Sequence, residues 1–137
     1  MDIMLNIFID GASRGNPGPA AYAFIFVENN KKTFEKSEFI GKATNNVAEY
    51  TGILNSLNQA KKIFHGKVKL YSDSQLAIRQ LNKEYQIKAN HLSKIAYKIF
   101  DLVKNFESVE FIHVPRTNKY IQICDTLCNE TLDAKGY

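Results

Sequence analysis

Four acidic residues stand where a chain of 137 residues would normally place apolar or neutral side chains: Asp10, Glu49, Asp73 and Asp125. Two of them close apolar runs that are typical of strands, and the other two share a helical stripe with apolar residues three or four positions away. This pattern predicts that all four point inward, where an uncompensated carboxylate costs on the order of several kcal/mol. No lysine or arginine recurs beside each acid at a matching spacing. We therefore expect a divalent cation to compensate them.

The length and composition bound the architecture. With 45% hydrophobic residues, the chain can form one core that buries about two thirds of its unfolded surface, and we expect a single domain over residues 1–137. No apolar run approaches the roughly 20 residues of a membrane-spanning helix, and the start lacks a signal-peptide pattern. These features predict a soluble, cytoplasmic protein, and the start at Met1 favours a free-standing chain.

The formal net charge is +4, with basic residues spread along the chain. This balance favours polyanionic partners such as nucleic acid, although ordinary solvated lysine faces explain it as well. The two cysteines, Cys124 and Cys128, stand four residues apart in a predicted helix, where side chains share a face but rarely reach disulfide geometry. We interpret them as reduced core residues rather than as a metal or redox pair.

The order of apolar patterns predicts an α/β fold. Three closely joined strands should form an antiparallel meander, and the later strands, which alternate with helices, should extend it into a five-stranded mixed sheet with helices on both faces. Residues 11–19, rich in glycine and proline, read as a loop, and residues 28–31, which include Asn29 and Asn30, as a hairpin turn. Asn45 or Asn46 should cap the first helix. The predicted strands cover 3–10, 20–27, 32–40, 67–72 and 109–114, and the predicted helices end near 64, 81, 106 and 133, the last of them beginning at 121.

Four segments resemble, in order and spacing, the signature motifs of type 1 ribonuclease H. Residues 10–19 read DGASRGNPGP, residues 44–49 TNNVAE and residues 71–76 YSDSQL, and the closing motif combines VPR at 114–116 with CDTLCN at 124–129. The resemblance spans the whole chain and implies a ribonuclease H-like fold. Residues 82–88 leave no room for the extra helix and basic protrusion of some members, so the chain resembles the short single-domain form.

The resemblance implies that Asp10, Glu49, Asp73 and Asp125 are catalytic and bind two metal ions. Their oxygen ligands suit Mg²⁺, with Mn²⁺ as a possible substitute, and include none of the sulfur or imidazole of a zinc site. In a two-ion mechanism one ion activates the attacking water and the other stabilises the leaving oxygen. We expect both ions to share Asp10. Taken singly, each acid could instead be an ordinary strand-end or boundary residue.

The resemblance also implies which residues hold the substrate. Four amides stand at family positions that contact the minor groove of a hybrid, where they can bond to base edges and 2′-hydroxyls: Asn16, Asn45, Asn46 and Gln75. Lys42 and Thr44 match a phosphate pocket for the DNA strand. Lys42 is more often an arginine in the family, and a lysine replaces its bidentate fork with a point charge. An ordinary exposed lysine is the alternative for Lys42, as helix capping is for the asparagines.

The chain departs from the family before its last acid. Many members carry a histidine in that loop, and Arg116 stands as its substitute, with an electrostatic rather than an acid–base role because arginine does not deprotonate usefully. The loop from Arg116 to Asp125 is also longer than the commonest pattern. His113 lies in a strand pattern, and we interpret it as a core or edge residue rather than a catalytic one.

The resemblance implies a metal-dependent endoribonuclease that hydrolyses the RNA strand of RNA–DNA hybrids and leaves 5′-phosphate and 3′-hydroxyl ends. We expect it to act as a monomer without an obligate protein or membrane partner. Two alternatives stay open: a catalytically weak nucleic-acid-binding module of the same fold, and a related nuclease that also acts on double-stranded RNA or derives from a reverse transcriptase.

Overall fold

The structure is a computed structural model that describes residues 3–137. The described part of the chain contains five strands and four helices, in the order β1 (Met4–Ser13), β2 (Gly18–Glu28), β3 (Lys31–Ala43), α1 (Asn45–Ala60), β4 (Lys67–Ser72), α2 (Gln75–Leu81), α3 (Asn90–Val103), β5 (Ser108–His113) and α4 (Lys119–Ala134). Within these residues, no helix combines the length and apolar character that crossing a membrane requires.

The strands form one mixed sheet in the order β3-β2-β1-β4-β5. The first three strands pair antiparallel, whereas β4 runs parallel to both β1 and β5. The predicted five-stranded sheet is therefore confirmed. Its central strand is β1, as the nearly continuous apolar run indicated, because a strand covered on both faces needs apolar side chains in both directions.

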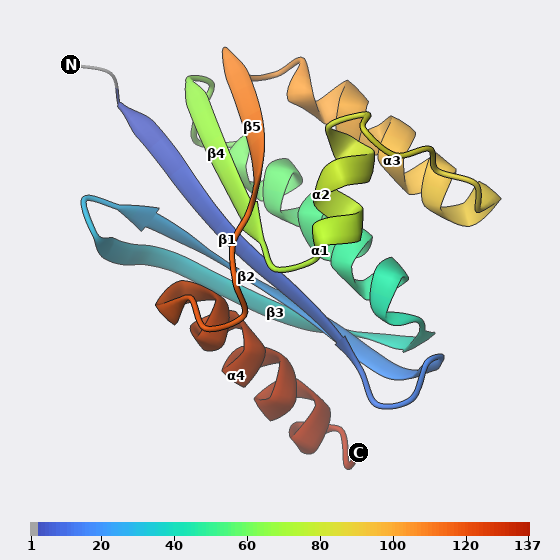
Figure 1. The fold of residues 1–137 in the computed structure, drawn as a ribbon. Helices are drawn as coiled ribbons and strands as arrows, with labels where there is room; N and C mark the ends of the chain where they lie inside the picture. The colour runs from blue at the N-terminus through green and yellow to red at the C-terminus, as the bar shows by residue number, and fades with distance from the viewer. Residues whose placement is uncertain (1–2) are drawn as a thin grey trace.

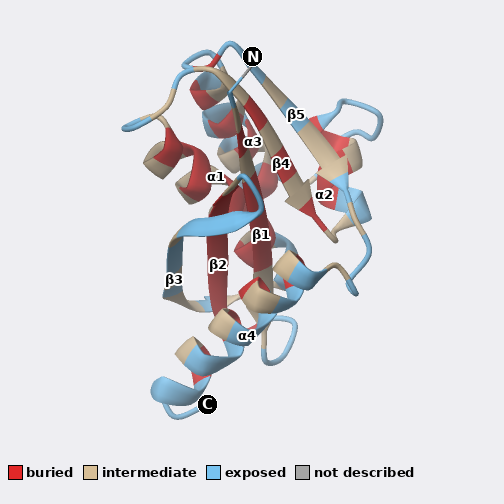
Figure 2. Ribbon diagram, turned by 90° about the vertical axis from the view of Figure 1, so that its left-hand side faces the viewer, coloured by how far each residue is buried: buried red, intermediate tan, exposed pale blue. Residues whose placement is uncertain are grey.

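Helices cover both faces of the sheet (Figure 1). Helices α1 and α3 pack over one face, around a core that includes Ile7, Ile9 and Phe24. Helix α4 packs over the other face, against Phe8 and Ile25. Figure 2 shows buried residues concentrated in β1, β2 and the inner sides of the helices. Because side chains alternate along β1, Asp10 belongs to the same face as Phe8, which is the face that α4 covers.

Strand β1 is longer than the sequence predicted. Residues 11–13, expected in a loop, continue the ladder with β2, and Asp10 pairs with Ala23 in mid-strand rather than closing the strand. The glycine and proline content indicated a loop, but the backbone hydrogen bonds to β2 hold residues 11–13 in an extended strand. Only residues 14–17 lie between the two strands. The predicted turn between β2 and β3 is confirmed, with Asn29 and Asn30 both at positive φ, as a tight hairpin requires.

The helix ends also differ from the predictions. Thr44, not Asn45 or Asn46, caps α1, and its side chain accepts a hydrogen bond from the Val47 N–H. Helix α1 ends at Ala60 and α3 at Val103, each before an irregular turn that the apolar period does not distinguish from a helix. Helix α4 begins at Lys119, earlier than predicted, because the Asn118 side chain caps it. Cys124 and Cys128 are buried and free, as expected.

Gly11 allows β1 and α1 to approach closely. A Cβ atom built on Gly11 would lie 2.5 Å from the Glu49 backbone nitrogen. We predict that Gly11→Ala lowers the free energy of unfolding by about 3 kcal/mol, because overpacking against backbone cannot relax by side-chain rotation. Gly41→Ala is the matched control. Its Cβ would meet nothing within 4 Å and φ is +80°, so we expect only a conformational cost of about 1 kcal/mol. Urea unfolding measures both, and equal losses would contradict the steric explanation.

Candidate active site

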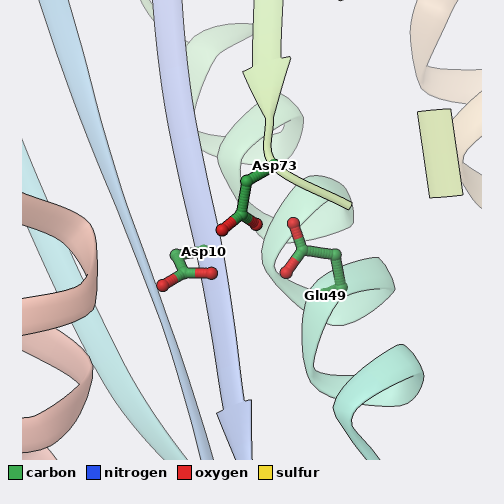
Figure 3. A group of neighbouring side chains, drawn as sticks. All are labelled: Asp10, Glu49 and Asp73. Atoms are coloured by element: carbon green, nitrogen blue, oxygen red, sulfur yellow. The ribbon is translucent and has the colours of Figure 1, made fainter. Parts of the chain in front are cut away.

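Three acids from three different elements meet at one end of the sheet. Asp10, Glu49 and Asp73 each offer a carboxylate oxygen, and these oxygens all lie within 4.8 Å of one another (Figure 3). Asp10 comes from β1, Glu49 from α1, and Asp73 from the residue that follows β4. Asp10 and Glu49 are buried and Asp73 is partly buried. The tertiary structure therefore assembles three of the four acids singled out in the sequence.

The parallel pairing of β1 and β4 brings the two aspartates together. Their register joins Phe8 to Tyr71. Two residues further along each strand stand Asp10 and Asp73, beyond the last paired residues. Residues at equivalent positions of two paired parallel strands lie side by side, so this register alone brings the two carboxylates together.

Two hydrogen bonds hold the Glu49 carboxylate. The Gly11 N–H donates to Oε2 at 2.8 Å, and the Ser72 hydroxyl donates to Oε1. Ser72 is fully buried and also accepts a hydrogen bond from the Ser74 N–H at 3.0 Å. Because one contact comes from β1 and the other from β4, Glu49 is oriented by the same two strands that carry Asp10 and Asp73.

The site is electrostatically unfavourable without a cation. Burial, followed by the nearby charges of Glu49, Asp73 and Asp125, raises the pKa of Asp10 to about 9. Burial also raises the pKa of Glu49 to about 8, although the Ser72 hydrogen bond opposes this. The pKa of Asp73 is raised by burial and lowered by the Arg116 charge. Carboxylates with raised pKa values release protons when a cation binds, so this donor set fits a hard divalent ion.

Asp125 lies apart from the three-acid cluster. It is exposed on α4, so the prediction that it points inward is wrong. The buried stripe of α4 consists of Ile121, Cys124, Cys128 and Leu132, and Asp125 stands beside this stripe rather than in it. Nevertheless, Asp125 lines the same cleft as the three acids, and its charge raises the pKa of both Asp10 and Asp73. It therefore faces the cluster across the cleft.

The cleft has a volume of about 560 Å³. The four acids share it with Arg116, Asn45 and Asn46. Arg116 is 92% exposed, and its Nε lies 3.9 Å from Oδ2 of Asp73. His113 ends the edge strand β5 and is exposed, and its charge also lowers the Asp73 pKa.

The remaining predicted substrate residues, Asn16, Lys42, Thr44 and Gln75, do not line the cleft. Asn16 and Asn45 belong to one chain of hydrogen bonds, in which the Asn45 N–H donates to the Asn16 side chain and the Ser13 N–H donates to the Asn45 side chain, both at 3.0 Å. Thr44 uses its hydroxyl to cap α1, and Lys42 is exposed. Gln75 is also exposed, and when its amide is oriented with the oxygen toward Arg79, it accepts from that guanidinium at 2.9 Å.

Sequence reasoning missed the residues that orient Glu49. Ser72 directly precedes Asp73, and Gly11 directly follows Asp10. Both therefore lie in motifs in which the sequence predicts a role only for the acid. The alternation of a strand offered a signal for Ser72, because it follows Val68 and Leu70 at the alternate positions that face the core.

Comparison with known proteins agrees with this geometry. A family model described as reverse transcriptase-like matches residues 8–131. The chain is 36% identical over 128 residues to a bifunctional protein of Mycobacterium tuberculosis, covering 91% of this chain and 34% of that protein. It is 34% identical over 123 residues to ribonuclease HI of Helicobacter pylori, covering 87% and 77% respectively. The chain thus spans about a third of the length of the first curated relatives that it matches.

A solved structure of LC11-RNase H1 in complex with an RNA/DNA hybrid superimposes with a TM-score of 0.88 at 31% identity, covering 97% of this chain and 99% of that one. A mixed sheet with helices on both faces, three carboxylates gathered beside its central strands, and this likeness place the chain in the ribonuclease H-like class of α/β proteins. Within that class, the chain belongs to the ribonuclease H family.

We predict that Asp10→Asn stabilises the metal-free protein by about 2 kcal/mol at pH 7. The folded pKa of about 9 exceeds the ordinary value of 3.8, so the folded protein retains a proton that the unfolded chain has released. The stability associated with Asp10 is therefore full below about pH 4 and is lost as the pH rises toward 9. Urea unfolding at pH 4, 7 and 9 should show the gain of the variant growing with pH. Asp101→Asn, an exposed acid on α3, is the control. A gain that does not grow with pH would contradict the prediction.

We predict that Ser72→Ala weakens divalent-ion binding about tenfold at pH 7, since one lost hydrogen bond to a charged group is worth about 1.5 kcal/mol or more. Loss of the Ser72 hydroxyl frees the Glu49 carboxylate to rotate and raises its pKa further, because that bond lowers it. Isothermal titration with Mg²⁺ measures the effect. Ser56→Ala is the matched control, as its buried hydroxyl donates only to a backbone carbonyl of α1. Equal affinities in both variants would overturn this role of Ser72.

Proposed function

We propose that this chain is a metal-dependent endoribonuclease that hydrolyses the RNA strand of RNA–DNA hybrids, leaving 5′-phosphate and 3′-hydroxyl ends. The observation that carries the proposal is the meeting of Asp10, Glu49 and Asp73 within 4.8 Å in a cleft that also contains Asp125. The likeness to LC11-RNase H1, solved with a hybrid, supports the substrate class.

The proposed cofactor is a pair of Mg²⁺ ions, with Mn²⁺ as a substitute. A bound divalent ion polarises a phosphoryl oxygen and provides a nucleophilic water at neutral pH. Asp10 points from the central strand toward the face that α4 covers, with Glu49 and Asp73 on its other side (Figure 3). We therefore assign Glu49 and Asp73 to one ion, Asp125 to the other, and Asp10 to both. Hydrogen bonds from the Gly11 N–H and the Ser72 hydroxyl fix the orientation of the Glu49 carboxylate, which supports this role.

The proposed hybrid-binding residues lie in and around the cleft. Asn46 lines it, and its amide can bond to base edges and 2′-hydroxyls in a minor groove. Asn16 and Asn45 direct their side-chain oxygens to backbone N–H groups, which leaves their amide N–H groups as the donors for a substrate. Gln75 completes the proposed amide set, while Lys42 and Thr44 are proposed to contact a phosphate of the DNA strand.

Arg116 is proposed to act on the scissile region by charge. Its guanidinium lies at the cleft beside Asp73 and is largely exposed, so it can move to a phosphate without breaking contacts of its own in the core. An arginine stays protonated at neutral pH and cannot exchange a proton during the reaction. Its proposed contribution is to attract and orient the phosphate.

We further propose that residues 1–137 act as one ribonuclease H domain, as a cytoplasmic monomer without an obligate protein partner. The single sheet and the two cores that pack against it support the domain assignment. The bifunctional relative, of which the chain covers 34%, shows that a matching segment also occurs within a longer protein.

Matched substrates test the proposed activity. A labelled hybrid, a duplex RNA and a duplex DNA of one sequence are incubated with Mg²⁺, Mn²⁺ or chelator. We expect cleavage of the hybrid alone, abolished by chelator and reduced at least about a hundredfold by Asp73→Asn, since the lost charge stabilisation is worth several kcal/mol. Asp101→Asn provides the matched control.

Other outcomes would favour the alternatives. Binding of the hybrid without cleavage would indicate a nucleic-acid-binding module, and equal cleavage of duplex RNA would indicate a broader nuclease. Activity that persists in chelator, or in Asp73→Asn, would refute the metal-dependent mechanism.

A further inference from the structure

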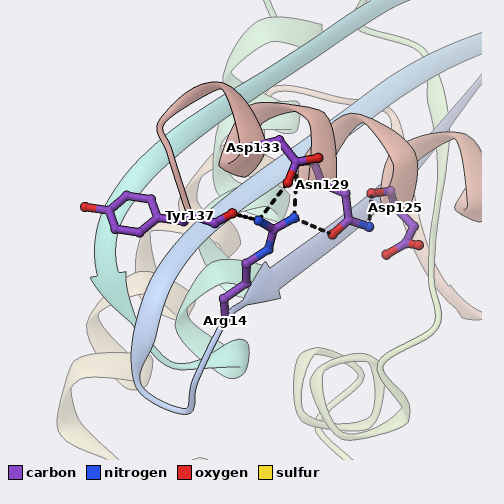
Figure 4. A network of polar contacts seen from close by, with 5 residues as sticks. All are labelled: Arg14, Asp125, Asn129, Asp133 and Tyr137. Carbon is purple, nitrogen blue, oxygen red and sulfur yellow. Dashed lines mark hydrogen bonds and ion pairs between the residues drawn. The ribbon is translucent and has the colours of Figure 1, made fainter.

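An arginine outside the acid cluster contacts the helix that carries Asp125. Arg14 lies in the turn between β1 and β2, and its guanidinium reaches the last turns of α4 (Figure 4). Nη1 lies 2.8 Å from Oδ1 of Asp133 and also donates to the Tyr137 carbonyl. Nη2 lies 3.4 Å from the Asn129 carbonyl and 3.3 Å from its side-chain oxygen. One planar group therefore contacts three residues at the end of α4.

Asn129 connects this contact to Asp125. Its side-chain nitrogen donates to the Asp125 carbonyl at 3.1 Å, one helical turn earlier (Figure 4). The side-chain oxygen of the same amide accepts from Arg14. Arg14, Asn129 and the backbone of Asp125 thus form a continuous polar chain along the exposed side of α4.

The turn that carries Arg14 is itself held firmly. The Arg14 N–H donates to the Pro19 carbonyl at 2.8 Å, and a Cβ on Gly18 would come within 2.4 Å of the Arg14 carbonyl oxygen. Asn16 and Ser13, on either side of Arg14, bond to Asn45 at the start of α1. Arg14 therefore projects from a turn that is joined to the helix of Glu49.

Asp125 needs such a contact more than the other acids do. Asp10 and Asp73 are placed by the sheet register, and Glu49 by two hydrogen bonds, whereas α4 packs on its face of the sheet mainly through apolar side chains. Apolar contacts are non-directional, so they limit the rotation of a helix less sharply than polar contacts of fixed geometry do. A guanidinium fork has fixed geometry, so it resists rotation and sliding of α4.

We propose that Arg14 is a positioning residue that sets the location of Asp125 relative to Asp10, Glu49 and Asp73. This inference rests on the proposed function, in which Asp125 completes the metal-binding set. The side chains of Arg14 and Asp133 are 33% and 67% exposed, so solvent screens their ion pair and its contribution to stability is small. The effect of Arg14 is on geometry, because small displacements of a catalytic group reduce rates strongly.

Steady-state kinetics on the hybrid test this role in Arg14→Ala, Arg14→Lys and each combined with Asp125→Asn. We expect Arg14→Ala to lower kcat about tenfold and to leave KM within about twofold, the signature of an interaction that acts in the transition state. Arg14→Lys, which keeps the charge but loses the fork, should recover part of this loss. In the Asp125→Asn background, Arg14→Ala should cost less than about twofold more, because residues that act through one another are not additive. Lys104→Ala removes an exposed cation paired with Asp101 on α3 and is the matched control.

Hydrogen–deuterium exchange provides a readout that needs no activity. In the absence of substrate, Arg14→Ala should exchange the amides of residues 125–134 several times faster than the wild type, and Lys104→Ala should not. Unchanged exchange, an increase in KM alone, or a full additional loss in the Asp125→Asn background would each overturn the proposal. If wild type and Lys104→Ala both fail to cleave the hybrid, the proposed function is wrong, and the exchange experiment still decides whether Arg14 positions α4.

Discussion

The close approach of β1 to α1 at Gly11 is the constraint on which the rest of the site depends. With no side chain at this position, the Gly11 N–H reaches the Glu49 carboxylate at 2.8 Å, and the helix lies where any Cβ would collide with its backbone. This contact brings a buried acid to the edge where β1 and β4 already place two aspartates. The raised pKa values of Asp10 and Glu49 are the electrostatic consequence of that packing. A site of this kind lowers the stability of the metal-free protein and raises its affinity for a divalent ion.

The four acids differ in how the fold places them. Asp10 and Asp73 follow from the pairing of two parallel strands, and Glu49 from hydrogen bonds to those same strands. Asp125 belongs to a helix on the opposite face, attached through a separate core and through polar contacts at its end. The first three form a unit whose geometry the sheet determines. The position of the fourth depends on how α4 packs against the sheet and on the polar contacts at its end.

Much of the fold could be predicted because its signals are local. The continuous apolar run of β1, the helical periods and the asparagine turn between β2 and β3 indicated the elements and the mixed sheet. The errors occurred where local and tertiary effects compete. Residues 11–13 carry turn formers yet join the ladder with β2, and Thr44 caps α1 in place of two asparagines that local preference ranks higher. The predicted ends of α1 and α3 lie beyond the observed ends, because the apolar period of each helix continues into the following turn.

The sequence by itself determined the residue types of the site, since an unusual set of acids at the ends of apolar runs and on helical stripes can be read without coordinates. It also determined their order and spacing, which carried the resemblance to the ribonuclease H family. Only the tertiary structure decided which acids meet: three converge and Asp125 stands apart, exposed, because the rotation of α4 depends on its packing rather than on its period. It alone revealed that Ser72 and Gly11 orient Glu49 and that Arg14 reaches the end of α4. Such contacts join residues far apart in the chain, and no local pattern encodes the distance between them.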